Sequence, residues 1–321
     1  MTPKSQTSTP RVSPSPSFKG RAKSVSMKRA RNRIVRGLLA IAAGISIVTT
    51  IAIVLVLGTE AYSFFALEEV SVSEFFFGTK WSPLLGHKKH FGIWPLISGT
   101  MLVTIVASLI AIPCGVVTAI FLSEYAPSPV RNILKPTLEV LAGVPTVVYG
   151  FFALTVITPV VQSIISGVDI YNALSAGIAV GIMCIPIVTS MSEDAIRSVP
   201  DSLREGSFAL GGTKLDTSVK VVFPAALSGV ISSCLLAIAR AVGETMIVAL
   251  AAGNLAQLTL NPTNQVQTMT AYTVQIFLGD TDAIGVEYKS SYAVAATLFV
   301  MTLALTWIGH SVTRRYKEVY S

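Results

Sequence analysis

The sequence predicts an all-α membrane protein with six transmembrane helices. Hydrophobic residues make up 52% of its 321 residues and charged residues only 13%, whereas about a quarter of the residues in soluble domains are charged. The apolar residues form long uncharged runs, each able to cross a hydrocarbon core of about 30 Å as a helix. The predicted spans cover residues 37–58, 96–122, 137–161, 171–191, 225–251 and 290–311.

The segment before the first span, residues 1–36, is basic. It contains ten of the 24 Lys and Arg residues and none of the 17 Asp and Glu residues. Because this composition cannot bury a core, we expect a disordered cytoplasmic tail ahead of a transmembrane domain over residues 37–321. The tail is interpreted as an anchor beside anionic lipid; an arm that binds nucleic acid is the alternative, and we do not expect nucleic acid as a partner.

The distribution of positive charge predicts the orientation. With the N-terminus inside and six alternating spans, the inner segments hold nineteen Lys and Arg residues and the outer segments four. Cytoplasmic segments of membrane proteins are enriched in these residues. We therefore expect both termini in the cytoplasm.

The loop between the fourth and fifth spans, residues 192–224, carries the signals of two short helices. Ser202 and Glu205 have the spacing of a capping box, in which an N-cap serine and a later glutamate satisfy backbone N–H groups. Gly211 provides a C-terminal stop, and Thr213 can cap a second helix. We interpret the loop as a docking surface for a cytoplasmic partner; a helical hairpin without a partner is the alternative.

The fifth span contains two charges that are costly in lipid. Arg240 and Glu244 are the only charged residues between Lys220 and Asp280. Four residues apart on a helix, they would share one face, and intramembrane charges usually face a cavity or another helix. Arginine suits oxyanions, so we expect a path for an oxyanion with Glu244 as the counter-charge. An internal salt bridge that fixes helix packing is the alternative.

Other residues in the spans are expected to be structural. Pro145 in the third span and Pro186 in the fourth each remove a backbone hydrogen bond, so kinks are expected there. These kinks are either packing features or candidate helix hinges. Glu193 and Asp194, at the end of the fourth span, are expected to be solvated.

The sequence contains no pattern typical of a metal site or a nucleotide site. The three cysteines lie far apart in apolar runs and have no metal-binding or redox spacing. The G-x4-G-K-[ST] phosphate loop is also absent, so we expect this chain not to bind ATP itself. We predict no metal, no cofactor and no catalytic residues, and an intramembrane enzyme is disfavoured.

The loop resembles a motif of the membrane subunits of bacterial ABC importers, E-A-A-x3-G-x9-I-x-L-P. The Glu, the Gly and the Pro of the motif match with identical spacing, while Gly-Ser replaces Ala-Ala, and Val and Phe replace Ile and Leu. In that family the loop is a coupling helix that enters a cleft of the ATPase subunit. The resemblance implies ATPase-coupling residues at Ser202, Glu205, Gly206, Ser207, Gly211 and Pro224.

The segment "RAVGETMIV", Arg240–Val248, is similar to "RAIGETMIV" of the C-type permeases of the phosphate-specific transport system. "LAGVPTVVYGFFAL", Leu141–Leu154, also resembles that family. The resemblance implies the type I importer permease (MetI-like) fold, with the coupling helix between the fourth and fifth transmembrane helices. It also implies a substrate path at Arg240, Glu244 and Thr245.

The resemblance further implies import of inorganic phosphate across the bacterial cytoplasmic (inner) membrane by alternating access. The implied partners are a homologous A-type permease, two ATP-binding subunits that hold ATP and Mg, and an extracytoplasmic phosphate-binding protein. A sulfate, molybdate or A-type phosphate permease is an alternative of the same class. An ATP-independent secondary anion carrier is an alternative of a different class.

Overall fold

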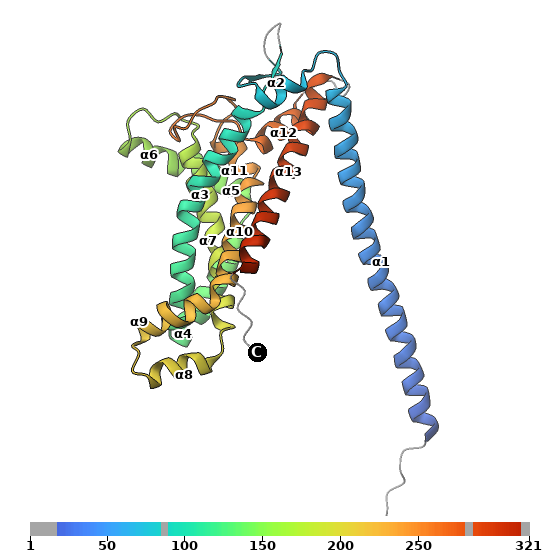
Figure 1. The fold of residues 1–321 in the computed structure, drawn as a ribbon, viewed down its shortest axis with the longest axis vertical. Coiled ribbons are helices and arrows are strands. Elements are labelled where there is room, and N and C mark those ends of the chain that lie inside the picture. Colours follow the sequence, from blue (N-terminus) through green and yellow to red (C-terminus); the bar gives the residue numbers. More distant parts are fainter. Residues whose placement is uncertain (1–17, 85–88, 280–284, 316–321) are drawn as a thin grey trace, which may run out of the picture. The chain divides into compact units, whose positions relative to one another are not determined.

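The computed structural model describes residues 18–84, 89–279 and 285–315, and it confirms the predicted all-α fold with six spans (Figure 1). Six of its helical stretches are long and apolar enough to cross a membrane. They cover Asn32–Phe65, Trp94–Tyr125, Thr146–Ile164, Ala173–Arg197, Lys214–Val242 and Val286–Arg314.

The described chain divides into two compact units, residues 1–56 and 57–321. The first unit contains most of helix α1, Phe18–Phe65, whose apolar residues from Ile34 to Val56 are largely exposed. Residues 18–36, which the sequence analysis assigns to a disordered tail, form the first part of α1. The rest of that tail, residues 1–17, lies outside the described residues.

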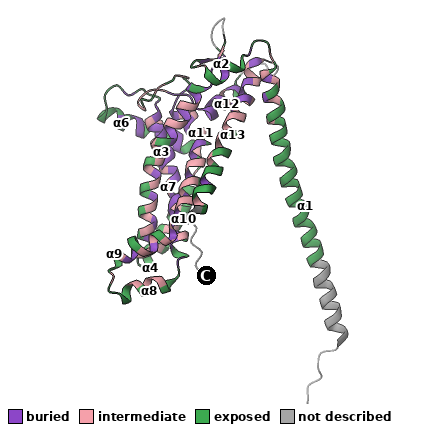
Figure 2. Cartoon of the chain, in the orientation of Figure 1, coloured by how far each residue is buried: buried purple, intermediate pink, exposed green. Residues whose placement is uncertain are grey.

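The second unit is built around α7, Ala173–Arg197, which is the most buried of the spans (Figure 2). It packs along α3, Trp94–Ile120, and α10, Phe223–Val242. Glycine permits the close approach of α3 and α7, because a Cβ on Gly177 would lie 2.6 Å from the Val106 side chain. Small residues at such contacts allow helix backbones to approach closely in membranes.

All six spans differ from their predicted bounds, and the third and the fifth differ most. The third begins at Thr146 rather than at residue 137, because Pro145 is the N-cap of α5, Thr146–Phe152, and a separate helix α4, Ser128–Ala142, precedes it. A π-helical turn, Ala153–Ile157, and α6, Thr158–Ile164, complete this span. Pro145 therefore marks a helix break rather than a kink. Pro186 is buried within α7, and the helix continues through it.

One end of the second unit carries short elements that cap the spans. They are α2, Val72–Phe77, the strands β1, Trp81–Ser82, and β2, His90–Phe91, and α12, Met269–Leu278. The strands pair antiparallel, with Trp81 opposite Phe91. An aromatic cluster packs this end against α13, Val286–Arg315, with Trp81 edge-on to Tyr272 at 4.9 Å between ring centroids.

The opposite end of this unit contains the loop between the fourth and fifth spans (Figure 1). The loop forms α8, Asp201–Ala209. The fifth span then begins with α9, Lys214–Thr217, and continues through a π-helical turn, Ser218–Val222, into α10. The Thr213 hydroxyl accepts a hydrogen bond from the Asp216 N–H, so the predicted cap of the second helix is confirmed.

Candidate functional site

The two intramembrane charges lie on either side of a helix break. Helix α10 ends at Val242 and α11, Met246–Ala251, begins four residues later. The expectation of one helix through residue 251, with Arg240 and Glu244 on a shared face, is wrong. Gly243 is the C-cap of α10, and glycine is the residue that most weakens a helix after proline.

Glu244 is buried and serves the next helix instead of pairing with Arg240. Its Oε1 accepts hydrogen bonds from the backbone N–H groups of Met246, at 3.1 Å, and Ile247, at 3.3 Å. Its carbonyl oxygen accepts a hydrogen bond from the Thr270 hydroxyl at 2.6 Å. A carboxylate at this position satisfies N–H groups that have no partner within the helix and is favoured by the helix dipole.

Arg240 occupies the last turn of α10 and is exposed. Within the described residues, no ion pair or hydrogen bond engages its guanidinium group. A cation near a helix C-terminus is favoured by the helix dipole, but its five N–H donors remain available to another group. Thr245 stands at the break, where its hydroxyl donates to the Gly243 carbonyl oxygen at 3.2 Å. Arg240 is therefore an arginine in an apolar span whose guanidinium has no partner among the residues that the structure describes.

Helix α8 presents an exposed surface made of the motif residues. Glu205 and Gly206 are exposed, and so are Phe208 and Leu210 at its end. The predicted capping box is wrong: Pro200 is the N-cap, Ser202 lies inside the helix, and none of the described side chains caps its N-terminus. Leu203 N–H donates to the Pro200 carbonyl oxygen instead. The exposed face of this helix is suited to contact a partner.

The turn after α8 is fixed by the other motif residues. Gly211 has a φ of +84°, the left-handed conformation that favours glycine at the end of a helix, as predicted. The Ser207 carbonyl oxygen accepts from the Gly212 N–H, and the Ser207 and Thr217 hydroxyls lie 2.8 Å apart. Pro224 is exposed in the first turn of α10, where its missing N–H is tolerated.

Glu193 is fully buried at the end of α7, so the expectation that it is solvated is wrong. Arg131 of α4 donates from Nε and Nη2 to Glu193 Oε1, at 3.1 and 3.0 Å. Lys135 Nζ lies 3.0 Å from Oε2, and Arg197 Nη1 lies 3.6 Å from Oε1. Asp194 is exposed as predicted, although it pairs with Lys135 at 3.1 Å.

Three cations surround the buried carboxylate of Glu193. Contact with Glu193, followed by contact with Asp194, raises the pKa of Lys135 above its ordinary value, so that it stays charged. A buried carboxylate is strongly destabilising unless cations compensate it, as three do here. The sequence gives no local signal of this arrangement, because Arg131 lies 62 positions from Glu193.

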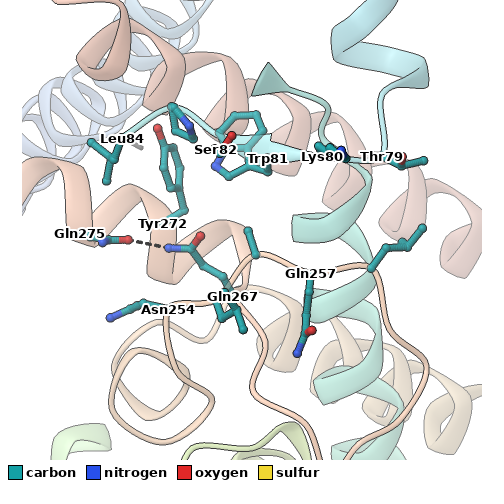
Figure 3. A pocket seen from close by; sticks show the side chains of 14 residues that line it. Thr79, Lys80, Trp81, Ser82, Leu84, Asn254, Gln257, Gln267, Tyr272 and Gln275 are labelled. Atoms are coloured by element: carbon teal, nitrogen blue, oxygen red, sulfur yellow. Dashed lines mark hydrogen bonds between the residues drawn. The ribbon is translucent and has the colours of Figure 1, made fainter. Parts of the chain in front are cut away.

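The capped end of the unit contains an open cavity of about 600 Å³ (Figure 3). It lies between the β1 segment, the stretch after α11 and α12, and its lining includes Lys80, Trp81 and Tyr272. Gln267 donates from Nε2 to Gln275 Oε1 at 2.5 Å beside it. The sequence did not indicate this cavity, which depends on contacts between distant segments.

Comparison with protein families identifies a match over residues 111–318 to the family "Binding-protein-dependent transport system inner membrane component". The chain is 36% identical over 273 residues to the "Probable ABC transporter permease protein YqgH" of Bacillus subtilis, covering 85% of this chain and 88% of that protein. It is 32% identical over 289 residues to the "Phosphate transport system permease protein PstC" of Mesorhizobium japonicum, covering 83% and 86% respectively.

Two solved structures share the fold. A bacterial ABC transporter for import of the polysaccharide alginate aligns with a TM-score of 0.61 at 12% identity, covering 90% of this chain and all of that one. The inward-facing MetNI methionine ABC transporter aligns with a TM-score of 0.52 at 17% identity, covering 71% and 95%. Both are ABC transporters, and the likeness confirms the predicted MetI-like permease fold.

Proposed function

The chain belongs to the family of binding-protein-dependent transport system inner membrane components, and we propose that it is the C-type permease of an ATP-driven importer of inorganic phosphate. The observation that carries this proposal is the likeness to PstC over most of both chains. Arg240 supports it independently: its guanidinium has no partner among the described residues, and a guanidinium binds phosphate oxygens in a bidentate geometry.

The proposed assembly contains four kinds of subunit. This permease pairs with an A-type permease, two ATP-binding subunits dock at the α8 surfaces of the permeases, and an extracytoplasmic phosphate-binding protein delivers the substrate. ATP and Mg belong to the partner ATPase. In this arrangement the chain is a multi-pass protein of the bacterial inner membrane with both termini in the cytoplasm. The charge asymmetry between the two sides supports that orientation.

The proposed mechanism is alternating access past the break between α10 and α11. Arg240 offers its N–H donors to the oxyanion, while Glu244 is held away from Arg240 by its bonds to the α11 N-terminus. Because its counter-charge is held away, Arg240 is available to a substrate. Closure of the ATPases moves α8, and α8 moves the spans that change access to the site.

The test is reconstitution into liposomes with and without the ATPase subunits. We expect phosphate uptake only with the ATPases, ATP and the loaded binding protein. Uptake by the chain without an ATPase would overturn the proposal in favour of a secondary carrier. Arg240→Gln is expected to abolish uptake while the complex still assembles, whereas loss of assembly would favour a packing role for Arg240.

A further inference from the structure

Charged residues surround the last turn of α7 where the coupling loop leaves it. We call them the α7 belt, which consists of Glu124, Arg131, Lys135, Glu193, Arg197 and Arg204. They come from the π-helical turn that follows α3, Phe121–Tyr125, and from α4, α7 and α8. Only Arg204 lies within the motif region, and it is not a motif residue.

Arg204 connects α8 to two spans at once. Its Nη2 donates to Glu124 Oε1 at 2.9 Å and to the Ile196 carbonyl oxygen at 3.0 Å. Its Nη1 donates to the Val199 carbonyl oxygen at 2.7 Å. The side chains of Arg204 and Glu124 are only 15% and 9% exposed, so this pair is shielded from water. The planar guanidinium holds these acceptors in fixed directions, which a lysine could not do.

Glu193 extends the connection from α7 to α4. Its contacts with Arg131 and Lys135 hold α4 against the end of α7. Helix α4 leads through Pro145 directly into α5, the first part of the third span. Charged contacts thus join α8 to the end of the second span and α7 to α4, and α4 is connected to the third span through the chain at Pro145.

The backbone beside the belt contains two π-helical turns. Glu124 lies in a π-helical turn, Phe121–Tyr125, at the end of the second span. A second π-helical turn, Ser218–Val222, joins the coupling loop to the fifth span. π-helical turns are rare in proteins as a whole, but those that do occur are often found at functional sites. Shielded ion pairs thus lie beside irregular backbone at the ends of the second span and of the coupling loop.

We propose that the α7 belt is the joint through which displacement of α8 moves the second, third and fourth spans, with Arg204 and Glu193 as its positioning residues. The inference rests on the proposed function, because a partner must act on α8. The exposed face of α8 receives the motion and Arg204, on its covered side, passes it to α3 and α7. Glu193 passes it onward to α4.

The test uses the complete importer in liposomes, with ATP hydrolysis and phosphate uptake measured on the same sample. The variants are Arg204→Gln and Glu193→Gln, which keep a polar side chain but remove the charge. Asp201→Asn and Asp194→Asn are the matched controls, because these carboxylates contact the same networks from positions that are 88% and 66% exposed. Co-purification of the ATPase measures assembly separately.

We expect both belt variants to assemble, to hydrolyse ATP and to lose phosphate moved per ATP by at least about fivefold, the lower range of coupling between distant sites. The controls should stay within about twofold of wild type. Arg204→Lys should give an intermediate ratio, because it keeps the charge without the fork. If Arg204 and Glu193 transmit the displacement, their substitution changes the ratio of phosphate moved to ATP hydrolysed. If their role is purely structural, it changes only the amount of assembled complex.

Two results would overturn the inference. The first is a wild-type ratio of phosphate to ATP in both belt variants. The second is failure to assemble in both, together with a wild-type ratio in Arg204→Lys and in the conservative Glu193→Asp. The proposed function is judged separately by the wild-type importer. If the wild-type importer transports a different oxyanion, the proposed function is wrong. The role of the α7 belt is then tested by the ratio of that oxyanion transported to ATP hydrolysed.

Discussion

The thermal stability of an Arg131→Gln variant tests whether Arg131 compensates the buried carboxylate of Glu193. The substitution removes two charge-assisted hydrogen bonds that converge on Glu193 Oε1 at 3.0 and 3.1 Å. Hydrogen bonds to charged groups contribute about 1.5–3 kcal/mol each, and removal of one partner of a buried ion pair costs about 3–5 kcal/mol. Lys135 remains 3.0 Å from Oε2, which partly compensates the carboxylate.

We therefore expect Arg131→Gln to lower the free energy of unfolding by about 2–3 kcal/mol. For a domain of this size the thermal midpoint falls by about 2–4 °C per kcal/mol, so a decrease of about 4–12 °C is predicted. Glu193→Gln should cost less, because it removes the buried charge together with its need for compensation. The order of the two variants is thus part of the prediction.

The assay follows labelling of Cys184 by a thiol-reactive fluorophore during heating in detergent. Cys184 is 1% exposed in α7, so it reacts only when this helix separates from its neighbours. Cys114 and Cys234 are replaced beforehand, because one is exposed and the other partly exposed. A midpoint within about 1 °C of the parent for Arg131→Gln, or a larger decrease for Glu193→Gln, would refute the reasoning.

Three further substitutions test separate parts of the structure. Gly177→Val should separate α3 from α7, because even a Cβ would lie 2.6 Å from Val106; native yield in detergent measures this, and a wild-type yield would contradict the packing. Gly211→Val should strain the turn after α8 by about 1–2 kcal/mol and reduce co-purification of the ATPase. Wild-type co-purification would show that residue 211 does not need a positive φ in the functional complex. Glu244→Ala should destabilise the chain by about 1–2 kcal/mol through the uncapped N–H groups of α11, and an unchanged midpoint would exclude the cap.

The six spans were predictable because each depends on a local run of apolar residues. Thr213 and Gly211 were predictable for the same reason, since capping and left-handed turns are set by neighbouring residues. The bounds of the third and fifth spans differ most from prediction, and in the fifth span local signals conflict. The Arg240 and Glu244 spacing favours one helix, whereas Gly243 favours a break, and the bonds from Met246 and Ile247 to the Glu244 carboxylate accompany the break.

The environment of Glu193 could not be predicted from its neighbours. Its polar sequence context and its place at a helix end favour solvation, and two of its partners come from α4. The same holds for Arg204, whose acceptor Glu124 lies 80 positions away. Local sequence patterns indicate which residues form a helix, but they do not indicate which distant helix packs against a given residue of it.

The measurement that tests the phosphate assignment most directly is ATP hydrolysis by the reconstituted importer with a panel of loaded binding proteins. We predict that the phosphate-loaded protein stimulates hydrolysis and that sulfate-loaded and molybdate-loaded proteins do not. The stimulation should be coupled to phosphate uptake in the same liposomes and should be lost with Arg240→Gln. Stimulation by sulfate or molybdate in place of phosphate would contradict the assignment.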